Sequence, residues 1–303
     1  MDIYLPIAGQ SVNALFIVVL GFLVGMLSGM FGVGGGFLTT PLLIFYGIPP
    51  TVAVASASTQ ITGASVSGVM VHMRRGGVDL KMGGVMIVGG LIGTVIGAGV
   101  FRFLQASGQV DVVIGFLYVV ILASIGGLMF KDALVALGYV QGPAPKPQQR
   151  GHNRWVASLP LRWRFYSSGL YISPVAPLAL GFVAGVLTVL LGIGGGFILI
   201  PAMIYLLGMA ARVVIGTSLV MILAVSAVTT MVHALTTGAV DIVLAGLLLV
   251  GGVIGAQYGA LLAARTKPDL LRFALAAIIL AVALRMFLGL TWRPDEIFSI
   301  EYL

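Results

Sequence analysis

Two runs of three glycines are the residues of this sequence best suited to holding a charged ligand. The first run is Gly34, Gly35 and Gly36, and the second is Gly194, Gly195 and Gly196. Three consecutive glycines unwind a helix easily, because glycine tolerates backbone angles that other residues avoid. A helix that begins after such a break presents free amide N–H groups and the positive end of its dipole. The two runs therefore predict anion-binding sites at two helix N-termini.

A polar segment follows the first glycine run and is a candidate to complete such a site. Ser56, Thr59 and Gln60 recur at helical spacing, so they share one face of the segment. Gln60 is the strongest indication, because an amide in apolar surroundings needs hydrogen-bond partners and offers two N–H donors. The second half has Thr217 and Ser218 at the equivalent helix start, but no amide at the position equivalent to Gln60. We therefore expect the two halves to differ in their chemistry.

Two histidines and two aspartates lie at the ends of polar or apolar segments. A proton-linked gate is one interpretation of His72 and His233, since histidine titrates near neutral pH. Capping or hydrogen bonding is the more common role of a histidine at a membrane interface. Asp79 and Asp241 are interpreted as N-caps of the helices that follow them. These residues do not form a closed ligand set, so we predict no bound metal and no cofactor.

Charged residues are absent from the centres of the predicted membrane segments. Their absence argues against a buried carboxylate proton relay and against a cation site built from acidic side chains. The segments also lack a nucleophile paired with a base, so we predict no catalytic residues and no enzymatic activity. An anion held by helix dipoles and neutral donors fits the same pattern.

The composition is that of a chain embedded in a membrane. Of its 303 residues 59% are hydrophobic and 8% are charged, and the mean hydropathy is +1.14. Soluble domains carry about 25% charged residues. The apolar stretches are continuous, which predicts helices and not an outer-membrane barrel. The cations behind the net charge of +7 lie in short loops, which indicates orientation in a bilayer and no nucleic-acid partner. We therefore expect an all-α polytopic membrane protein whose partners are the lipid bilayer and a small anion.

Ten membrane elements are predicted, five in each half. The second element of each half, 37–47 or 197–208, is a half-helix of about 16 Å. Gly25, Gly93 and Gly97 are interpreted as helix-packing residues and not as ligand contacts. The ten ranges are about 12–31, 37–47, 51–72, 82–104, 110–130, 174–192, 197–208, 211–234, 241–263 and 270–290.

The two halves of the chain are copies of one another. Residues 21–37 and 181–197 are identical at nine of seventeen positions, at a constant offset of 160. Such internal duplication in a hydrophobic chain predicts a two-repeat membrane protein. We expect an N-terminal transmembrane repeat at 1–137, a basic Pro-rich linker at 138–173 and a C-terminal transmembrane repeat at 174–303.

The basic residues predict how the repeats are oriented. If the short elements cross the membrane, each repeat has five passes, the repeats are inverted, and most cations share one side. If the short elements are re-entrant, Arg265, Lys267 and Arg272 fall outside, which contradicts the positive-inside rule. We therefore predict inverted repeats, with both termini outside and the linker at 138–173 in the cytoplasm.

Three motifs occur in order along the chain: GxxSGxFGVGGGFLTTPLL at 25–43, GIGGGFILIPAM at 192–203, and the stretch from GTSL to histidine at 216–233. In both repeats they resemble the TauE/SafE sulfite exporter family of bacterial anion permeases. The resemblance implies a multi-pass transporter of the bacterial inner membrane that moves small sulfur-containing or carboxylated anions. The residues that it implies as functional are the glycine breaks, Thr39, Thr40, Ser56 to Gln60, Thr217 and Ser218.

These expectations together describe a secondary transporter of small sulfur anions, such as sulfite, thiosulfate, or organosulfonates including sulfoacetate. The anion would bind between the two repeats, and access would alternate as one repeat rocks against the other. An anion channel and a small-carboxylate permease are the alternatives within transport. A membrane scaffold that docks a partner through the linker is a further alternative, and a homodimer is left open.

Overall fold

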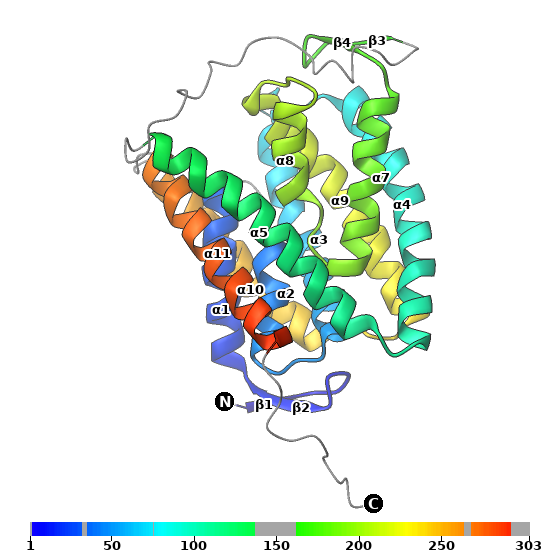
Figure 1. Ribbon diagram of the computed structural model, residues 1–303, viewed down its shortest axis with the longest axis vertical. Coiled ribbons are helices and arrows are strands. Elements are labelled where there is room, and N and C mark those ends of the chain that lie inside the picture. Colours follow the sequence, from blue (N-terminus) through cyan, green and yellow to red (C-terminus); the bar gives the residue numbers. More distant parts are fainter. Residues whose placement is uncertain (1, 32–34, 75, 137–161, 264–267, 292–303) are drawn as a thin grey trace, which may run out of the picture.

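The computed structural model describes residues 2–31, 35–74, 76–136, 162–263 and 268–291, which form ten helices and two β-hairpins (Figure 1). The first half contains β1 (Asp2–Leu5), β2 (Gln10–Asn13), α1 (Ala14–Phe31), α2 (Gly36–Phe45), α3 (Pro50–Arg74), α4 (Leu80–Ala106) and α5 (Val110–Ala136). The second half contains β3 (Trp163–Phe165), β4 (Leu170–Ile172), α7 (Val175–Leu191), α8 (Gly196–Tyr205), α9 (Ala211–Thr236), α10 (Ile242–Ala263) and α11 (Pro268–Thr291). The ten predicted membrane elements are therefore confirmed as helices.

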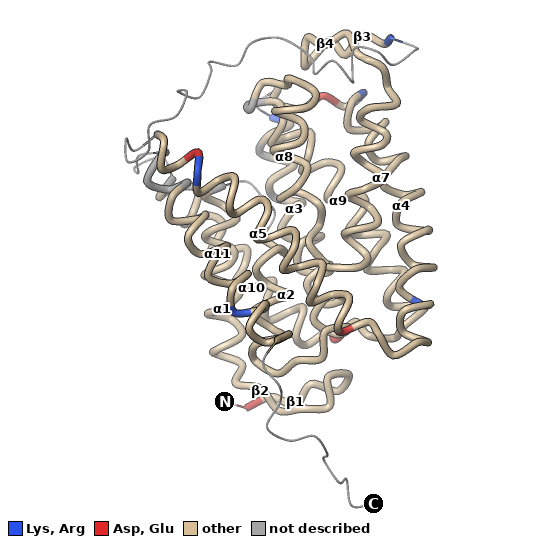
Figure 2. The backbone as a smooth tube through the Cα atoms, in the orientation of Figure 1, with Lys and Arg blue, Asp and Glu red and all other residues tan. Residues whose placement is uncertain are grey.

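The chain is an all-α polytopic membrane protein. Five helices are long and apolar enough to cross a bilayer: α4, α5, α9, α10 and α11. Four shorter apolar helices accompany them, namely α1, α2, α7 and α8. In Figure 2 the charged residues of the described part of the chain lie toward the two ends of the backbone, and its middle carries none. That distribution is expected where hydrocarbon surrounds the middle, because a charge there is costly.

The short helix of each half follows a break at the glycine run. Gly35 is the N-cap of α2 with φ of 69°, and Gly195 is the N-cap of α8 with φ of 74°. Side chains other than glycine rarely adopt such positive angles. The end of α2 returns to the start of α1, because the Tyr46 ring stacks on Phe16 with 4.6 Å between ring centroids. In each half, α1 or α7 is thus followed by a half-helix that runs back beside it (Figure 1).

A β-hairpin precedes the first helix of each half, and the sequence pattern did not predict either one. β1 pairs with β2 and β3 pairs with β4, both antiparallel, around turns that contain Gly9 and Gly169. The second hairpin lies inside the predicted linker 138–173, whose residues 138–161 are outside the described residues. The two hairpins lie at opposite ends of the molecule in Figure 1. The helices that follow the hairpins, α1 and α7, therefore start from opposite ends of the molecule (Figure 1).

Two helix pairs are packed through glycines, and each pair joins one helix from each half. In the α1–α10 pair, a Cβ on Gly25 would lie 2.2 Å from the Gly252 carbonyl oxygen. In the α4–α7 pair, a Cβ on Gly93 would lie 2.1 Å from the Phe182 carbonyl oxygen. Gly97 likewise faces α7, where its Cβ would lie 3.1 Å from the Val186 Cα. The predicted packing role of Gly25, Gly93 and Gly97 is confirmed.

The remaining helices complete the bundle around the two breaks. α3 packs against α9, and each also packs on a glycine-rich helix of the other half, α3 on α10 and α9 on α4. α5 and α11 pack on each other and lie side by side in Figure 1. α5 also contacts α3, α4 and α7, which places it across the region of the breaks.

Candidate functional site

The two glycine breaks lie next to each other in the structure. A Cβ on Gly36 would lie 2.7 Å from the carbonyl oxygen of Gly192, so the two backbones are in direct contact. Phe37 and Phe197, which open α2 and α8, stack with 4.6 Å between ring centroids and 8° between ring planes. Segments 160 residues apart in sequence therefore meet at one place. Gly34 of the first run is outside the described residues.

Both half-helices start at this meeting point without a side-chain cap. Because Gly35 and Gly195 are the N-caps, neither α2 nor α8 has a side-chain hydrogen bond to its first turn. The N-terminal amides of a helix have no partner within the helix, and its dipole makes that end positive. Gly194, Gly195 and Gly196 are buried, as are Gly35 and Gly36. The site therefore brings two positive helix ends together in a region shielded from bulk water.

Thr39 and Gln60 form the polar side of the first break. The Thr39 hydroxyl donates to Gln60 Oε1 at 3.0 Å, and the Gln60 Nε2 donates to the Leu248 carbonyl at 3.4 Å. Gln60 is 4% exposed, and its amide connects α2 to α3 and α10. The equivalent position in α9 is Met221, which is fully buried among apolar side chains. The predicted chemical difference between the halves is therefore present in the structure.

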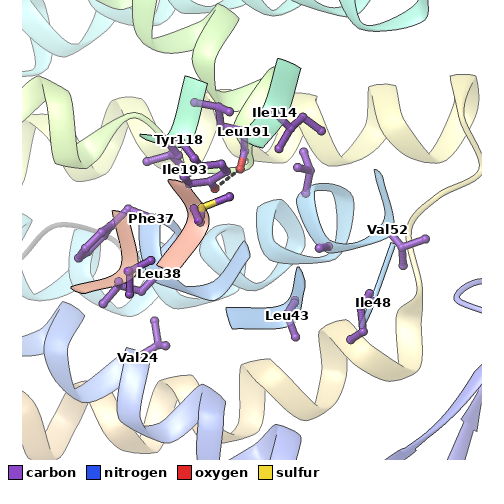
Figure 3. Close-up of a cluster of buried hydrophobic side chains, with 14 of the residues drawn as sticks. Val24, Phe37, Leu38, Leu43, Ile48, Val52, Ile114, Tyr118, Leu191 and Ile193 are labelled. Carbon is purple, nitrogen blue, oxygen red and sulfur yellow. Dashed lines mark hydrogen bonds between the residues drawn. The ribbon is translucent and has the colours of Figure 1, made fainter. Parts of the chain in front are cut away.

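Thr40 and Tyr118 lie beside the second break. Thr40 is buried, and its hydroxyl oxygen would lie 3.2 Å from a Cβ on Gly192. The Tyr118 hydroxyl, from α5, donates to the carbonyl oxygen of Leu191, the last residue of α7. Figure 3 shows this hydrogen bond next to Ile193. Tyr118 therefore satisfies a carbonyl that the end of α7 leaves without a helical partner.

Four predicted polar residues have their hydroxyls engaged in other contacts. Ser56 and Thr217 accept hydrogen bonds from the backbone amides of Asp241 and Asp79, at 3.3 Å and 2.9 Å. The Ser218 hydroxyl bonds back to its own helix, at Ile215. The Thr59 hydroxyl donates to Ala55 of its own helix and also lies 3.4 Å from that of Thr230 in α9. None of these contacts involves a glycine of the two breaks.

The aspartates Asp79 and Asp241 are buried N-caps, which confirms their interpretation from the sequence. Asp79 Oδ1 accepts from the amide of Met82 in α4, and Asp241 Oδ1 accepts from the amide of Leu244 in α10. The second oxygen of each carboxylate binds a hairpin: Asp79 Oδ2 accepts from Ser168, and Asp241 Oδ2 accepts from the amide of Ile7. Each hairpin is thus attached to a helix of the other half.

The two histidines occupy different environments. His233 is 1% exposed; its Nε2 lies 3.1 Å from the Val189 carbonyl oxygen, and its ring meets Phe101 edge-on. Since a carbonyl only accepts, that contact requires a proton on Nε2. His233 therefore supports the end of α7, close to the second break. His72 is half-buried near the end of α3. A proton-linked gate at either residue stays a prediction.

The described residues hold no group of three or more His, Cys, Asp or Glu side chains that could bind a metal. The polar groups around the breaks are hydroxyls, an amide and backbone N–H groups. These groups suit an anion that is recognised by neutral donors and helix dipoles.

Three features of the site were not assigned a role from the sequence. Phe37 and Phe197 occupy equivalent positions in the two repeats, and this identity was the only indication in the sequence that they have a role at the breaks. Tyr118 carried no such signal, because a single tyrosine in an apolar span is also typical of packing. The attachment of the hairpins to Asp79 and Asp241 joins the two halves, so local sequence could not indicate it.

The chain resembles known membrane proteins along most of its length. The family model described as "Sulfite exporter TauE/SafE" matches residues 17–286. The probable membrane transporter protein YjnA of Bacillus subtilis is 28% identical over 275 residues, which cover 89% of this chain and 98% of that protein. YdhB of the same organism, also named a probable membrane transporter protein, is 30% identical over 250 residues, or 81% and 89% of the two chains.

A more distant plant relative matches over a short segment. "Sulfite exporter TauE/SafE family protein 6" of Arabidopsis thaliana is 48% identical over 52 residues, which are 17% of this chain and 12% of that protein. No solved structure matches the chain significantly.

Proposed function

The chain belongs to the TauE/SafE sulfite exporter family of membrane transporters, and from its geometry we propose that it moves small sulfur-containing anions through a site between the two helix breaks. Sulfite, thiosulfate and organosulfonates such as sulfoacetate are the proposed substrates. The anion's charged group would lie on the amides at Gly35–Gly36 and Gly195–Gly196. Thr39, Thr40 and Gln60 would provide the neighbouring polar contacts.

The observation that carries this proposal is the meeting of two uncapped half-helices. α2 and α8 begin at the same place, where Gly36 contacts the backbone of Gly192 and Phe37 stacks on Phe197. Two positive helix ends aimed at one point favour an anion over a neutral solute or a cation. Broken helices near the middle of a membrane are a common substrate site in transporters built from repeats.

The neutral side chains around the breaks support a small anion with modest charge. Without a lysine or arginine among the described residues that surround the breaks, the charge of the ligand is balanced by dipoles alone. Dipoles of this kind are each worth about half an elementary charge, so two of them balance roughly one negative charge. A sulfonate or a hydrogensulfite ion fits that arrangement better than thiosulfate or sulfoacetate, which carry two negative charges.

We further propose alternating access and an inner-membrane location, with both termini outside and the linker in the cytoplasm. The placement of the two hairpins at opposite ends supports inverted repeats (Figure 1). The clustering of cations in Arg74, Lys81 and the linker supports a cytoplasmic linker. A reporter-fusion map tests the orientation. If a reporter that works only outside the cytoplasm is active when it is fused at residue 155, the proposed orientation is wrong.

Flux measurements on purified protein in proteoliposomes test the transport proposal. Sulfite, thiosulfate, taurine and sulfoacetate are each added to the vesicles in the presence of a membrane potential or a pH gradient. We expect at least one sulfur anion to accumulate above its equilibrium level, which a channel cannot achieve. A protein that passes none of the four sulfur compounds, or that passes only chloride, would contradict the proposal.

A variant pair links that flux to the glycine breaks. Gly36→Ala places a Cβ 2.1 Å from the Ile61 side chain and 2.7 Å from the Gly192 oxygen, whereas Gly84→Ala meets nothing within 4 Å. We expect Gly36→Ala to lower flux about tenfold, as the first turn of α2 is displaced from the site. Gly84→Ala is the matched control and should keep normal flux. Equal flux in the two variants would rule out the breaks as the site.

A further inference from the structure

The most extensive helix–helix contacts among the described residues join helices of different repeats. α1 of the first repeat is packed on α10 of the second, and α7 of the second is packed on α4 of the first. In both pairs the backbones touch: a Cβ on Gly255 would lie 2.0 Å from the Phe22 oxygen, and one on Gly181 would lie 2.1 Å from the Met86 oxygen. Such pairs hold together by close van der Waals contact, which is lost within a small displacement.

The buried aspartates Asp79 and Asp241 also connect each repeat to the other. Asp241 at the start of α10 is bound to Ser56 of α3 and to Ile7 of the first hairpin. Asp79 at the start of α4 is bound to Thr217 of α9 and to Ser168 of the second hairpin. Each α4 or α10 helix is therefore tied at its N-terminus to elements of the opposite repeat.

The glycine-packed helix pairs and the aspartate hydrogen bonds together define two bundles of helices, and these bundles do not coincide with the repeats. Bundle A consists of the β1–β2 hairpin, α1, α2, α3 and α10; its polar connection is the chain from Thr39 through Gln60 to Leu248. Bundle B consists of the β3–β4 hairpin, α7, α8, α9 and α4; its polar connection is the contact between His233 and Val189, beside Phe101 of α4. α5 and α11 pack on each other and border both bundles.

Between the bundles, the contact of α3 with α9 is of a different kind. α3 and α9 meet through hydroxyls, with the Thr62 hydroxyl 3.1 Å from that of Ser226 and the Thr59 hydroxyl 3.4 Å from that of Thr230. Thr59, Thr62 and Ser226 also bond to carbonyls four residues earlier in their own helices. When α3 and α9 separate, these three hydroxyls keep a partner, so the separation leaves few unsatisfied polar groups.

We propose that bundle A and bundle B, and not the two sequence repeats, are the rigid bodies that move during transport. The proposal rests on the transport function and on the site at the breaks, because that site lies between the bundles. α2 of bundle A and α8 of bundle B each bring one glycine break and one phenylalanine to it. Access alternates as the α3–α9 contact opens and the Phe37–Phe197 stack separates, while the glycine-packed pairs stay closed.

Cysteine pairs separate this mechanism from rocking of the repeats, since the chain has no cysteine of its own. The pair Gly97→Cys/Val189→Cys joins α4 to α7, because a Cβ on Gly97 would lie 3.4 Å from the Val189 Cβ. That spacing is close to the value of about 3.8 Å in disulfides. The two residues belong to different repeats and to the same bundle. The pair Thr62→Cys/Ser226→Cys joins α3 to α9 and belongs to different repeats and different bundles.

Sulfite flux is compared before and after oxidation of each pair in proteoliposomes, with the single-cysteine variants as controls. We expect the α4–α7 disulfide to leave flux within about twofold, and the α3–α9 disulfide to lower flux at least about tenfold until it is reduced. Loss of flux in the α4–α7 pair on oxidation, with recovery on reduction, would overturn the proposal. Unchanged flux with the α3–α9 disulfide formed would overturn it as well.

Distances between spin labels in lipid nanodiscs test whether the two bundles move as rigid bodies, and this test does not require a measurement of transport. Leu15 on α1, Leu261 on α10 and Val95 on α4 are 69%, 67% and 68% exposed, so all three accept a label. Leu15–Leu261 lies within bundle A and between repeats, whereas Leu15–Val95 lies within the first repeat and between bundles. We expect one narrow distance for Leu15–Leu261 and a broad or double distribution for Leu15–Val95.

A broad distribution for Leu15–Leu261 with a narrow one for Leu15–Val95 would contradict the proposal that the bundles are the moving bodies. Two equally narrow distributions, with and without sulfite, would contradict it as well. The proposed function fails separately, when none of the sulfur anions is transported. The distances still decide which helices move together in that case, so the two failures are distinguishable.

Discussion

At the scale of single residues, Gln60 differs most from the symmetry of the chain. It accepts from Thr39 at the first break and donates to the Leu248 carbonyl, while its counterpart Met221 lies in a buried apolar cluster. A buried amide with two partners positions the start of α2 relative to α3 and α10. Its N–H groups and the Thr39 hydroxyl are also the donors that an arriving anion would recruit.

Replacing Gln60 separates the binding role from a packing role. We expect Gln60→Leu to lower flux of the transported anion about tenfold, because the variant keeps the volume but removes the donor. The melting temperature should change by only a few degrees, since Thr39 retains its bond to the Gly35 carbonyl at 3.4 Å. Gln105→Leu, at an exposed position of α4, is the control. A Gln60→Leu protein with full flux would remove Gln60 from the site.

Tyr118 provides a stability test at the second break. Tyr118→Phe removes the hydroxyl that donates to the Leu191 carbonyl and leaves that buried oxygen without this donor. Leaving a buried acceptor unsatisfied costs about 1–3 kcal/mol. We expect a lower melting temperature in detergent, measured by intrinsic fluorescence, and Tyr258→Phe at an exposed position of α10 as an unaffected control. Equal melting temperatures would indicate that the end of α7 needs no support from α5.

At the scale of elements, the half-helices and the hairpins explain how two repeats form one site. α2 and α8 are only 10 residues long, so each reaches from one end of the molecule to its middle. Their N-termini meet there because α1 and α7 enter from opposite ends (Figure 1). The hairpins fix those entry points by binding the N-cap aspartates of α10 and α4.

The aspartate ties predict equivalent effects in the two repeats. Asp241→Ala removes the cap of α10 and the acceptor for the Ile7 amide, and Asp79→Ala removes the cap of α4 and the acceptor for Ser168. Each change should cost about 2 kcal/mol or more, from the lost cap and the unsatisfied amides. Thermal unfolding of both variants checks this, with the exposed Asp111→Ala as a control. A much smaller effect at one aspartate would mean that its hairpin is not needed for stability.

At the scale of the whole molecule, exchange of α4 and α10 between the repeats is the main organising feature. It places the glycine-packed pairs on either side of the α3–α9 contact and leaves the breaks between them. Lipid provides no hydrophobic force between helices, so close backbone contact is what holds such pairs together. The packing glycines whose Cβ would lie about 2 Å from a backbone oxygen, Gly25, Gly93 and Gly255, are therefore expected to be intolerant of even one added methyl group.

Gly255→Ala tests that expectation. Its Cβ would lie 2.0 Å from the Phe22 carbonyl oxygen and 2.8 Å from the carbonyl carbon, both backbone atoms that cannot rotate away. We expect α1 and α10 to separate, with a loss of folded protein in size-exclusion chromatography and a melting temperature lower by several degrees. Gly246→Ala in the same helix meets nothing within 4 Å and is the matched control. Similar behaviour of the two variants would argue against the α1–α10 packing.

Much of the architecture could be predicted from the sequence, because bilayer physics acts locally. Continuous apolar stretches have to become helices, and three glycines in a row have to interrupt one. The ten elements, the two half-helices and the packing glycines Gly25, Gly93 and Gly97 follow from such rules. The roles predicted for the gating histidines and for the full set of ligand residues remain predictions.

The β-hairpins could not be predicted in the same way. The β3–β4 hairpin falls in a segment whose composition is typical of a linker, and β1–β2 precedes the first span. Both make hydrogen bonds to buried aspartates more than 80 residues away in sequence, which local sequence patterns do not reveal.

The sequence by itself determined the class of the protein, the duplication and the position of each helix break, since these depend on hydropathy, identity and backbone freedom at single positions. The tertiary structure alone decided that Ser56 and Thr217 bind the N-cap aspartates, while Thr39, Thr40 and Gln60 stay at the breaks. It also decided that α4 and α10 change partners. The physical reason is that a hydroxyl or a glycine can serve several neighbours equally well, and only the packed bundle selects which neighbour is within reach.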